Sequence, residues 1–374
     1  MRKSLFILCV LLVIGGCQKY LPQETLDERR VSFIAVGDNL MHQKLLDEAK
    51  TAEGYDFMKY YVNVQDDIQK ADLAFVNQET ILGGEQFGVQ GYPRFNTPDI
   101  MAQNLHDVGF NIVNGATNHA LDQGEVALLH SLSVFQQYDD MVYLGLYDSQ
   151  KKRDEIEVIE KNGMKIAFLS YNQLTNGHSL PHTYNMNLFD RELIQRDVEN
   201  AKEISDFIVV SCHWGNEYDL SPNNFQREYA LFMADLGVDV IIGTHPHTLQ
   251  PIEYIEGHDG HRTLVAYSLG NFVSGMMEED TQLEGMLSFD FVERENMYSI
   301  ENVTLTPLVN HYEIDDLTQA YETRHGFTVY RLKDYSEALS QKHGLNGYLD
   351  IEISIHKMKD RVRETITSGI NVEM

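Results

Sequence analysis

Two histidines separated by one residue, His245 and His247, follow a short apolar segment and a glycine. Residues 238–242 are mostly β-branched, which is typical of a buried parallel strand. In an extended loop alternate side chains point the same way, and Pro246 between the histidines restricts the backbone, so both imidazoles should face one point. Ligands of open α/β sheets bind beyond the strand ends, so this pair is a candidate ligand site. Two solvated loop histidines are the alternative.

Other predicted strands also end in residues that can bind metal. In a parallel sheet these ends lie along one edge, so the side chains should converge there. Carboxylates, imidazoles and amide oxygens at one point favour Zn, Mn or Fe, whereas a purely polar ligand cleft is the alternative. The residues concerned are Asp38 and His42, Asn77 and Glu79, Asn118, His119 and Asp122, and His213 and Glu217.

The elements that must position these residues alternate between strands and helices, which indicates an α/β protein. Residues 162–163, Asn-Gly, predict a type I′ hairpin turn between two short strands. Thr97 and Pro98 are typical of a helix start and Gly109 of a helix end. Strands are predicted at 31–36, 72–76, 111–113, 142–146, 156–160, 165–170, 207–211, 238–242 and 263–269, and helices at 45–60, 97–108, 125–137, 188–204 and 224–236.

The C-terminal part has a different pattern. Residues 285–293 and 300–305 alternate in polarity and predict a closing antiparallel pair. Beyond residue 310 the pattern is weaker and more charged, with helices expected at 336–342 and 357–366. We therefore expect a main domain at 31–309 and a peripheral helical extension at 310–374.

The N-terminus has the pattern of an export signal. A basic start and an apolar run at 5–14 are typical of a signal peptide and too short for a comfortable membrane span. Cys17 follows two glycines, and this junction resembles a bacterial lipobox. That resemblance implies a signal peptide at 1–16, lipid on Cys17, a tether at 17–30 and a bacterial lipoprotein anchored to the cell membrane outside the cytoplasm. With Cys9 in the signal, Cys212 is the only free thiol, so no internal disulfide is expected.

The composition narrows the class of partner. The chain has 374 residues, is 43% hydrophobic and carries a formal net charge of -28. Such a charge argues against a nucleic-acid surface. An anionic polymer would need local positive charge, which a bound metal could supply.

Six short motifs, in order, resemble those of the capsule-synthesis CapA family, whose members take part in making or exporting poly-γ-glutamate. The resemblance covers about 32–308. It implies a metallophosphoesterase-like β-sandwich flanked by helices, in four layers α/β/β/α, with a two-metal centre. The motifs are Val36-Gly37-Asp38, Asn77-Gln78-Glu79, Ala116-Thr117-Asn118-His119, His213-Trp214-Gly215-Asn216-Glu217, Gly243-Thr244-His245-Pro246-His247 and Ser268-Leu269-Gly270-Asn271-Phe272.

The resemblance also implies roles for individual residues. Glu79 would replace a bridging aspartate, and His119 would protonate a leaving oxygen. The chain departs from the phosphoesterase pattern because Asn39 and Leu40 follow Asp38 in place of an Asp-x-His motif, and the second motif is Asn-x-Glu. The resemblance implies two divalent ions, which would be Mn, Fe or Zn. Their implied ligands are Asp38, Glu79, Asn118, His213, His245 and His247.

Further residues could contact substrate or support the ligands. Trp214 could stack on substrate or pack in a wall, and Asn271 could brace its loop. Glu217 could orient a ligand histidine or be an ordinary loop carboxylate. Cys212, next to His213 in a strand, should point to the opposite face. His42, Asn77 and Asp122 complete this group of candidates.

Two functions are consistent with these residues. The first is a metal-dependent, phosphoesterase-like hydrolase that cuts a phosphoester or an amide of an anionic polymer. The second is a non-catalytic factor for polymer binding, assembly or export, whose site binds ligand or stabilises the fold. In either function, membrane-bound capsule-synthesis subunits are candidate partners and nucleic acid is not.

Overall fold

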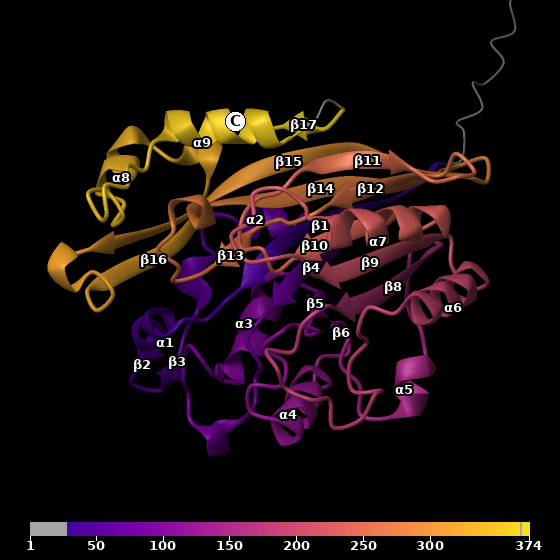
Figure 1. The fold of residues 1–374 in the computed structure, drawn as a ribbon, viewed down its shortest axis with the longest axis horizontal. Helices are drawn as coiled ribbons and strands as arrows, with labels where there is room; N and C mark the ends of the chain where they lie inside the picture. Colours follow the sequence, from indigo (N-terminus) through magenta and orange to yellow (C-terminus); the bar gives the residue numbers. More distant parts are fainter. Residues whose placement is uncertain (1–27, 367–368) are drawn as a thin grey trace, which may run out of the picture.

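Two β-sheets packed face to face form the centre of the protein in the computed structural model, which describes residues 28–366 and 369–374 (Figure 1). The predicted signal peptide and Cys17, and most of the predicted tether, lie outside the described residues. Within those ranges no helix has the length and apolar character needed to cross a membrane.

The first sheet has the order β16-β15-β14-β1-β4-β5-β6, with β13 beside β1 and β17 beside β15. Strands β1, β4, β5 and β6 run parallel, while β14, β15 and β16 extend the sheet as an antiparallel ribbon. The strands are β1 (Glu28–Asn39), β4 (Leu73–Gln78), β5 (Ile112–Asn114), β6 (Val142–Leu144), β13 (Asn271–Val273), β14 (Leu283–Arg294), β15 (Met297–Ile314), β16 (Arg324–Arg331) and β17 (Asn371–Val372).

The second sheet has the order β11-β12-β10-β9-β8-β7, and its β8, β9, β10 and β12 are parallel. The hairpin between β7 and β8 turns at Asn162 and Gly163, both with positive φ, as the predicted type I′ turn requires. The strands are β7 (Glu157–Lys161), β8 (Met164–Asn172), β9 (Phe207–His213), β10 (Val240–Thr244), β11 (Ile252–Glu256) and β12 (Arg262–Ala266).

Aromatic side chains between the sheets show that the sheets form a sandwich. The ring of Phe33 on β1 stacks on Phe168 of β8 with 6.3 Å between centroids. Phe207 on β9 lies 4.8 Å from Phe291 on β14. These residues belong to one buried core, which excludes water between the sheets and stabilises their packing.

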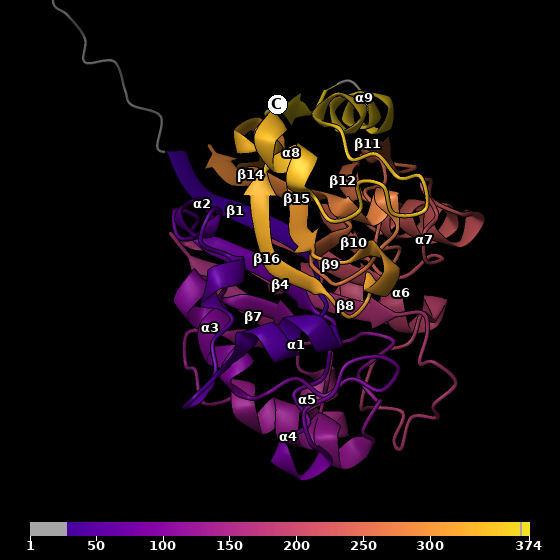
Figure 2. The same ribbon diagram turned by 90° about the vertical axis from the view of Figure 1, so that its left-hand side faces the viewer.

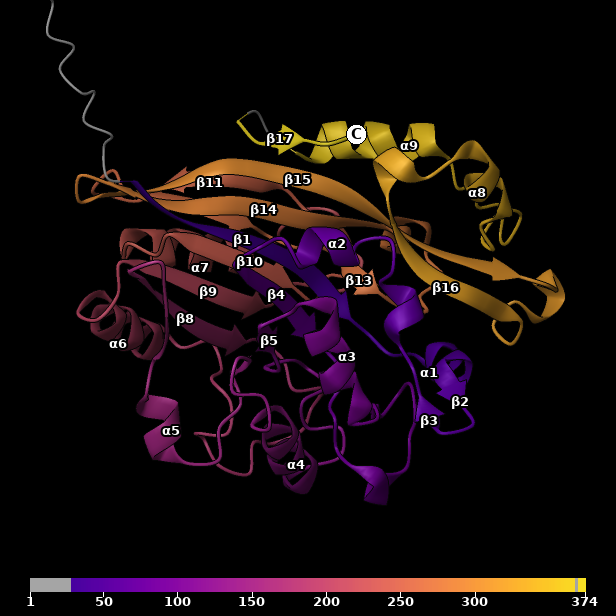
Figure 3. The ribbon, with the colours of Figure 1, turned by 180° about the vertical axis from the view of Figure 1, so that it is seen from behind.

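Helices cover both outer faces. Seen from one side, α6 and α7 lie over β8, β9 and β10 (Figure 1); from behind, α2 and α3 lie over β1 and β4 (Figure 3). This arrangement confirms the predicted four-layer α/β/β/α sandwich. The helices are α1 (Gln43–Ala49), α2 (Gln65–Ile68), α3 (Ile100–Val108), α4 (Glu125–Phe135), α5 (Gln150–Asp154), α6 (Arg191–Lys202), α7 (Asn224–Asp235), α8 (Glu337–Lys342) and α9 (Ile355–Thr365).

Two predicted helices were wrong in their bounds. The helix expected at 45–60 ends at Ala49 and continues into the small hairpin of β2 (Lys50–Thr51) and β3 (Gly54–Tyr55). Helix α3 begins at Ile100, after Asp99, and not at the Thr97-Pro98 pair. The Thr97 hydroxyl instead lies 2.6 Å from that of Thr80, so it does not cap the helix.

Residues 310–374 contribute strands as well as the predicted helices. Residue 310 lies within β15, and β16 pairs with the same strand. Helices α8 and α9 lie beside the β14–β15–β16 end of the first sheet (Figure 2). Met358 and Val362 of α9 are buried in the main core, so this segment packs on the sandwich.

Close contact between strands explains a glycine in the first motif. A Cβ atom on Gly37 would collide with the carbonyl oxygen of Gly270. The backbone N–H of Asp38 donates to that same carbonyl at 3.0 Å, which joins the end of β1 to the segment before β13. Glycine therefore permits the approach that brings Asp38 beside Asn271.

Candidate metal centre

The carboxyl ends of parallel strands from both sheets meet at one end of the sandwich. In the first sheet, Asp38 on β1 is in register with Asn77 on β4. In the second sheet, His213 on β9 is in register with Thr244 on β10. The Asp38 carboxylate accepts the backbone N–H of His245 at 3.2 Å, so a hydrogen bond links the two sheets at this point. The predicted convergence of strand ends is therefore present.

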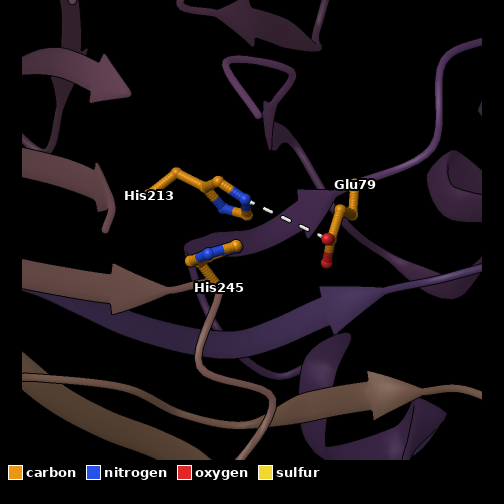
Figure 4. A group of neighbouring side chains, drawn as sticks. All are labelled: Glu79, His213 and His245. Carbon is orange, nitrogen blue, oxygen red and sulfur yellow. Dashed lines mark ion pairs between the residues drawn. The ribbon is translucent and has the colours of Figure 1, made fainter. Parts of the chain in front are cut away.

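Two groups of potential ligands share Glu79. Glu79, His213 and His245 place one ligand atom each within 4.8 Å of one another, and so do Asp38, Glu79 and His247. Figure 4 shows His213 and His245 facing the Glu79 carboxylate, with 4.0 Å between His213 Nε2 and Glu79 Oε1. A carboxylate common to two adjoining groups could hold a metal ion together with the other members of either group.

The buried polar atoms of this site fit a metal ion. Among the described residues, neither oxygen of Glu79 nor Nδ1 of His245 has a hydrogen-bond partner, although all three atoms are buried. Buried polar groups are normally paired because desolvation is costly. A divalent cation would supply the missing partner for both residues.

Burial keeps two of the candidate ligand histidines neutral, but it works against ionisation of Glu79. Burial, reinforced by the charges of neighbouring histidines, lowers the pKa of His213 well below its usual value and that of His245 to about 3. Both imidazoles are therefore neutral at pH 7 and able to coordinate. Burial raises the pKa of Glu79 well above 4.5, and nearby Asp38 raises it further, which outweighs the opposing effect of His247.

His247 is held by carboxylates. Its Nδ1 lies 3.1 Å from Asp38 Oδ2 and 3.0 Å from Asn271 Oδ1. Burial alone would lower its pKa, but Glu79 and Asp38 raise the pKa of His247 to about 9. In the metal-free protein His247 is therefore protonated at pH 7, and coordination would release that proton.

The sequence predicted an extended loop at the two histidines, and this prediction was wrong. His245 and His247 have φ of 95° and 60°, which side chains larger than glycine rarely adopt. Their rings nevertheless lie 5.8 Å apart and both contribute ligand atoms to the groups above. Strained backbone of this kind persists only where the surroundings enforce it, and such strain clusters at functional sites.

A turn separates the roles of Asn118 and His119. Residues 118–123 form turns, and the backbone N–H of Ala120 donates to the Thr117 carbonyl at 3.3 Å. Asn118 Oδ1 lies 3.0 Å from His213 Nε2, next to the Glu79 group. His119 points elsewhere, because its Nδ1 lies 2.8 Å from the buried carboxylate of Asp122. The turn therefore places these two neighbouring side chains in different surroundings.

The other predicted residues take separate positions. Asn77 donates to Asp38 at 2.7 Å, and Asn271 contacts His247 as described. His42 belongs to neither ligand group that shares Glu79; it accepts from the N–H of Gly275 at 3.2 Å, and its ring lies against Phe95. Glu217 is exposed and forms a third group with His245 and His247.

Trp214 and Cys212 lie on the far side of the second sheet. Both are fully buried in the core between this sheet and helices α6 and α7. The Trp214 indole N–H donates to the Tyr267 carbonyl at 2.9 Å, and its ring stacks on Phe189. Of the two predicted roles for Trp214, wall packing is therefore correct and substrate stacking is wrong.

Some residues of the site were not predicted. Thr244 lies 2.9 Å from His213 Nδ1, and its place directly before His245 was the available signal. Phe95 packs edge-on against His119, and Asn176 lies 3.4 Å from Asn118. Both come from loops without a periodic pattern. Glu284 on β14 is buried near Asp38 with no hydrogen-bond partner in the described part of the chain.

Comparison with known proteins gives consistent matches. The profile of the family described as bacterial capsule synthesis protein PGA_cap matches residues 32–276. The PGA biosynthesis protein CapA of Bacillus subtilis (strain 168) is 38% identical over 174 residues, 45% of this chain and 44% of that protein. The capsule biosynthesis protein CapA of Bacillus anthracis is 31% identical over 179 residues, 45% of this chain and 41% of that protein. The match thus spans less than half of either relative.

Comparison with solved structures gives partial matches, one of which follows. A candidate 5′-nucleotidase from Staphylococcus aureus, solved in complex with alpha-ketoglutarate, has a TM-score of 0.49 and 16% sequence identity. The alignment covers 74% of this chain and 54% of that one.

Proposed function

Because the chain belongs to the bacterial capsule synthesis PGA_cap family, we propose that it is a CapA-like protein of capsule poly-γ-glutamate synthesis or export with a metal-dependent hydrolase-type site. The observation that carries the proposal is Glu79, a buried carboxyl group that has no hydrogen-bond donor among the described residues and is shared by two groups of candidate ligands. We further propose that lipid on Cys17 anchors the protein to the outer face of the cell membrane.

The residues of the site divide into ligands and an acid. Two divalent ions, when bound, would lower the pKa of a water and clamp the oxygens of an in-line displacement. Glu79 would hold both ions, and its burial keeps water from competing for the carboxylate. The full set of holding residues is Asp38, Glu79, Asn118, His213, His245 and His247.

His119 would donate the proton to the leaving group. Its Nδ1 is engaged by Asp122, so Nε2 is the atom left for the substrate. Asp122 is itself fixed, because its carboxylate accepts the N–H of Phe95 at 2.8 Å and its carbonyl accepts the Arg94 guanidinium. The imidazole is thus held in one orientation, which suits general-acid catalysis near neutral pH.

The second candidate function is a non-catalytic polymer-binding or assembly factor. The observation in its favour is that the first motif lacks the usual histidine. Leu40, two residues after Asp38, occupies the position of that histidine. It is a buried apolar residue and offers no atom that could bind a metal ion.

Metal analysis and one variant separate the two functions. The purified mature protein should contain divalent metal and hydrolyse either a phosphodiester or a γ-glutamyl amide. His119→Ala should keep its metal and lose about 10²–10⁴-fold in rate. If the variant loses metal, His119 is a ligand; if it keeps metal and capsule production in cells, the hydrolase proposal is wrong.

Anchoring has its own test. Cys17→Ser removes the lipidated thiol, so the variant should be released from the cell membrane or mislocalised. A variant that stays in the membrane unlipidated and uncleaved would show that the N-terminal segment is a plain anchor.

A further inference from the structure

An exposed carboxylate lies at the solvent side of the metal centre. Glu217 places an oxygen within 4.8 Å of a ring nitrogen of His245 and of His247. These two histidines belong to different ligand groups, so Glu217 lies beside both candidate ion positions. Glu217 is not among the ligands that the family resemblance implied.

The loop that carries Glu217 is tied to the histidine loop. The N–H of Tyr218 donates to the Pro246 carbonyl at 2.8 Å. The Asp219 carbonyl accepts the Thr248 hydroxyl at 2.7 Å and the Gln250 amide at 2.8 Å. Tyr218 has a φ of 67°, so the chain turns sharply at this point. Glu217 is thus positioned by backbone contacts on its C-terminal side, and its place beside the histidines is a property of the fold.

The side chain of Glu217 lies beside two histidines and near the Glu79 carboxyl without forming a close pair with any of them. No hydrogen bond or ion pair joins its side chain to another residue of the described ranges, and its negative charge helps to raise the pKa of the buried Glu79 carboxyl. Two carboxyl groups that lie near each other repel when both are ionised. A carboxylate at the solvent side of the metal centre would also repel an anionic substrate unless a cation neutralised it.

We propose that Glu217 is an additional ligand that closes the metal centre from the solvent side, and that the substrate displaces it. The inference rests on the proposed metal-dependent function. Because the side chain is exposed, it can leave the ion without opening the core. The centre would then have a buried bridging carboxylate, Glu79, on one side and an exchangeable carboxylate, Glu217, on the other.

Three variants test the proposal by metal affinity. Glu217→Gln removes the charge, whereas Glu217→Asp keeps the charge and shortens the side chain by one methylene. Glu228→Gln, on the exposed surface of α7, is the matched control for loss of one charge. Mn²⁺ affinity of each metal-free protein is measured by isothermal titration calorimetry, and folding is checked by circular dichroism.

If Glu217 is a ligand, Glu217→Gln and Glu217→Asp should both lose about tenfold or more in Mn²⁺ affinity. Replacing a residue that only supports a metal ligand already lowers metal affinity by about 10–100-fold. Glu228→Gln should bind as the wild type does. Glu217→Gln should also bind inorganic phosphate more tightly in the loaded protein, because no carboxylate has to be displaced.

Two results would overturn the inference. If Glu217→Asp retains wild-type affinity while Glu217→Gln loses it, the carboxylate acts only through its charge. If both variants bind Mn²⁺ as tightly as the wild type, Glu217 is an ordinary loop residue. A wild-type protein that binds no divalent metal would overturn the proposed function as well, so the two failures are distinguishable.

Discussion

Replacing Glu79 with glutamine should stabilise the metal-free protein against unfolding and destabilise the metal-loaded protein. Both Glu79 oxygens are buried without a donor among the described residues, and burial raises the pKa of the carboxyl well above 4.5. Glutamine has nearly the same shape and cannot ionise. His247 keeps the Asp38 carboxylate at 3.1 Å in the variant, so its charge is not left alone.

The expected size of the gain follows from the charge that glutamine lacks. An unpaired buried group costs about 1–3 kcal/mol when it is neutral and more when it is charged, so removing the charge should gain a similar amount, about 1–3 kcal/mol. The metal-free variant should therefore unfold about 1–4 °C higher than the wild type in a chain of this size. In the metal-bound state the order reverses, because a saturating ion at 100 times its Kd adds about 2.7 kcal/mol to the wild type and the variant lacks the shared ligand.

The pH dependence of this effect has a definite sign. An acid whose pKa is raised on folding destabilises the protein only above its unfolded pKa, and the cost grows as pH rises toward the folded value. The advantage of Glu79→Gln in the metal-free state should thus be smaller at pH 5 than at pH 7.5.

Calorimetric melting of chelator-treated and Mn²⁺-loaded protein checks these expectations, with Glu228→Gln as the control expected within about 0.5 kcal/mol of wild type. The reasoning is refuted if metal-free Glu79→Gln melts below the wild type at pH 7.5, or if Mn²⁺ shifts the two proteins equally.

Two further predictions concern the histidine loop and the outer core. Neighbouring carboxyl groups raise the pKa of His247 to about 9, so Mn²⁺ must displace a proton from it, and Mn²⁺ affinity should rise about tenfold per pH unit below pH 9. Titrations in buffers of different ionisation enthalpy should detect the released proton. An affinity that does not change between pH 7 and pH 8.5 would contradict this prediction. Trp214→Ala should lose about 3–5 kcal/mol of stability because it empties a buried site, while Mn²⁺ affinity stays at the wild-type value, as denaturant unfolding and calorimetry would show.

Local patterns in the sequence were sufficient to find most of the strands and the residues at their ends. Strand periodicity is a local property, so the alternation along β9 correctly placed Cys212 on the face opposite His213. The same alternation places Trp214 with Cys212, which is why its ring packs under helices and not in the site. The Asn162-Gly163 turn was predictable because few residues tolerate positive φ.

Helix ends were less predictable, because local preference competes with packing. Thr97 and Pro98 have the residue types of a helix start, yet the Thr97 hydroxyl contacts Thr80 at 2.6 Å. The segment at 45–60 has apolar residues throughout, but Phe57, Tyr60 and Tyr61 are buried in the main core. The chain leaves the helix and forms the β2–β3 hairpin before it reaches these residues, so packing overrides the local helical preference.

The identities of the candidate ligands came from the sequence, but their grouping came only from the tertiary structure. Asp38 and His247 come from different sheets, and only packing of the two sheets brings their side chains within 3.1 Å. The positive φ of His245 and His247, and the position of Glu217 beside them, follow from contacts between loops that are distant in sequence. Residue type and strand periodicity are local properties, whereas the sharing of Glu79 between two ligand groups depends on how the whole sandwich closes.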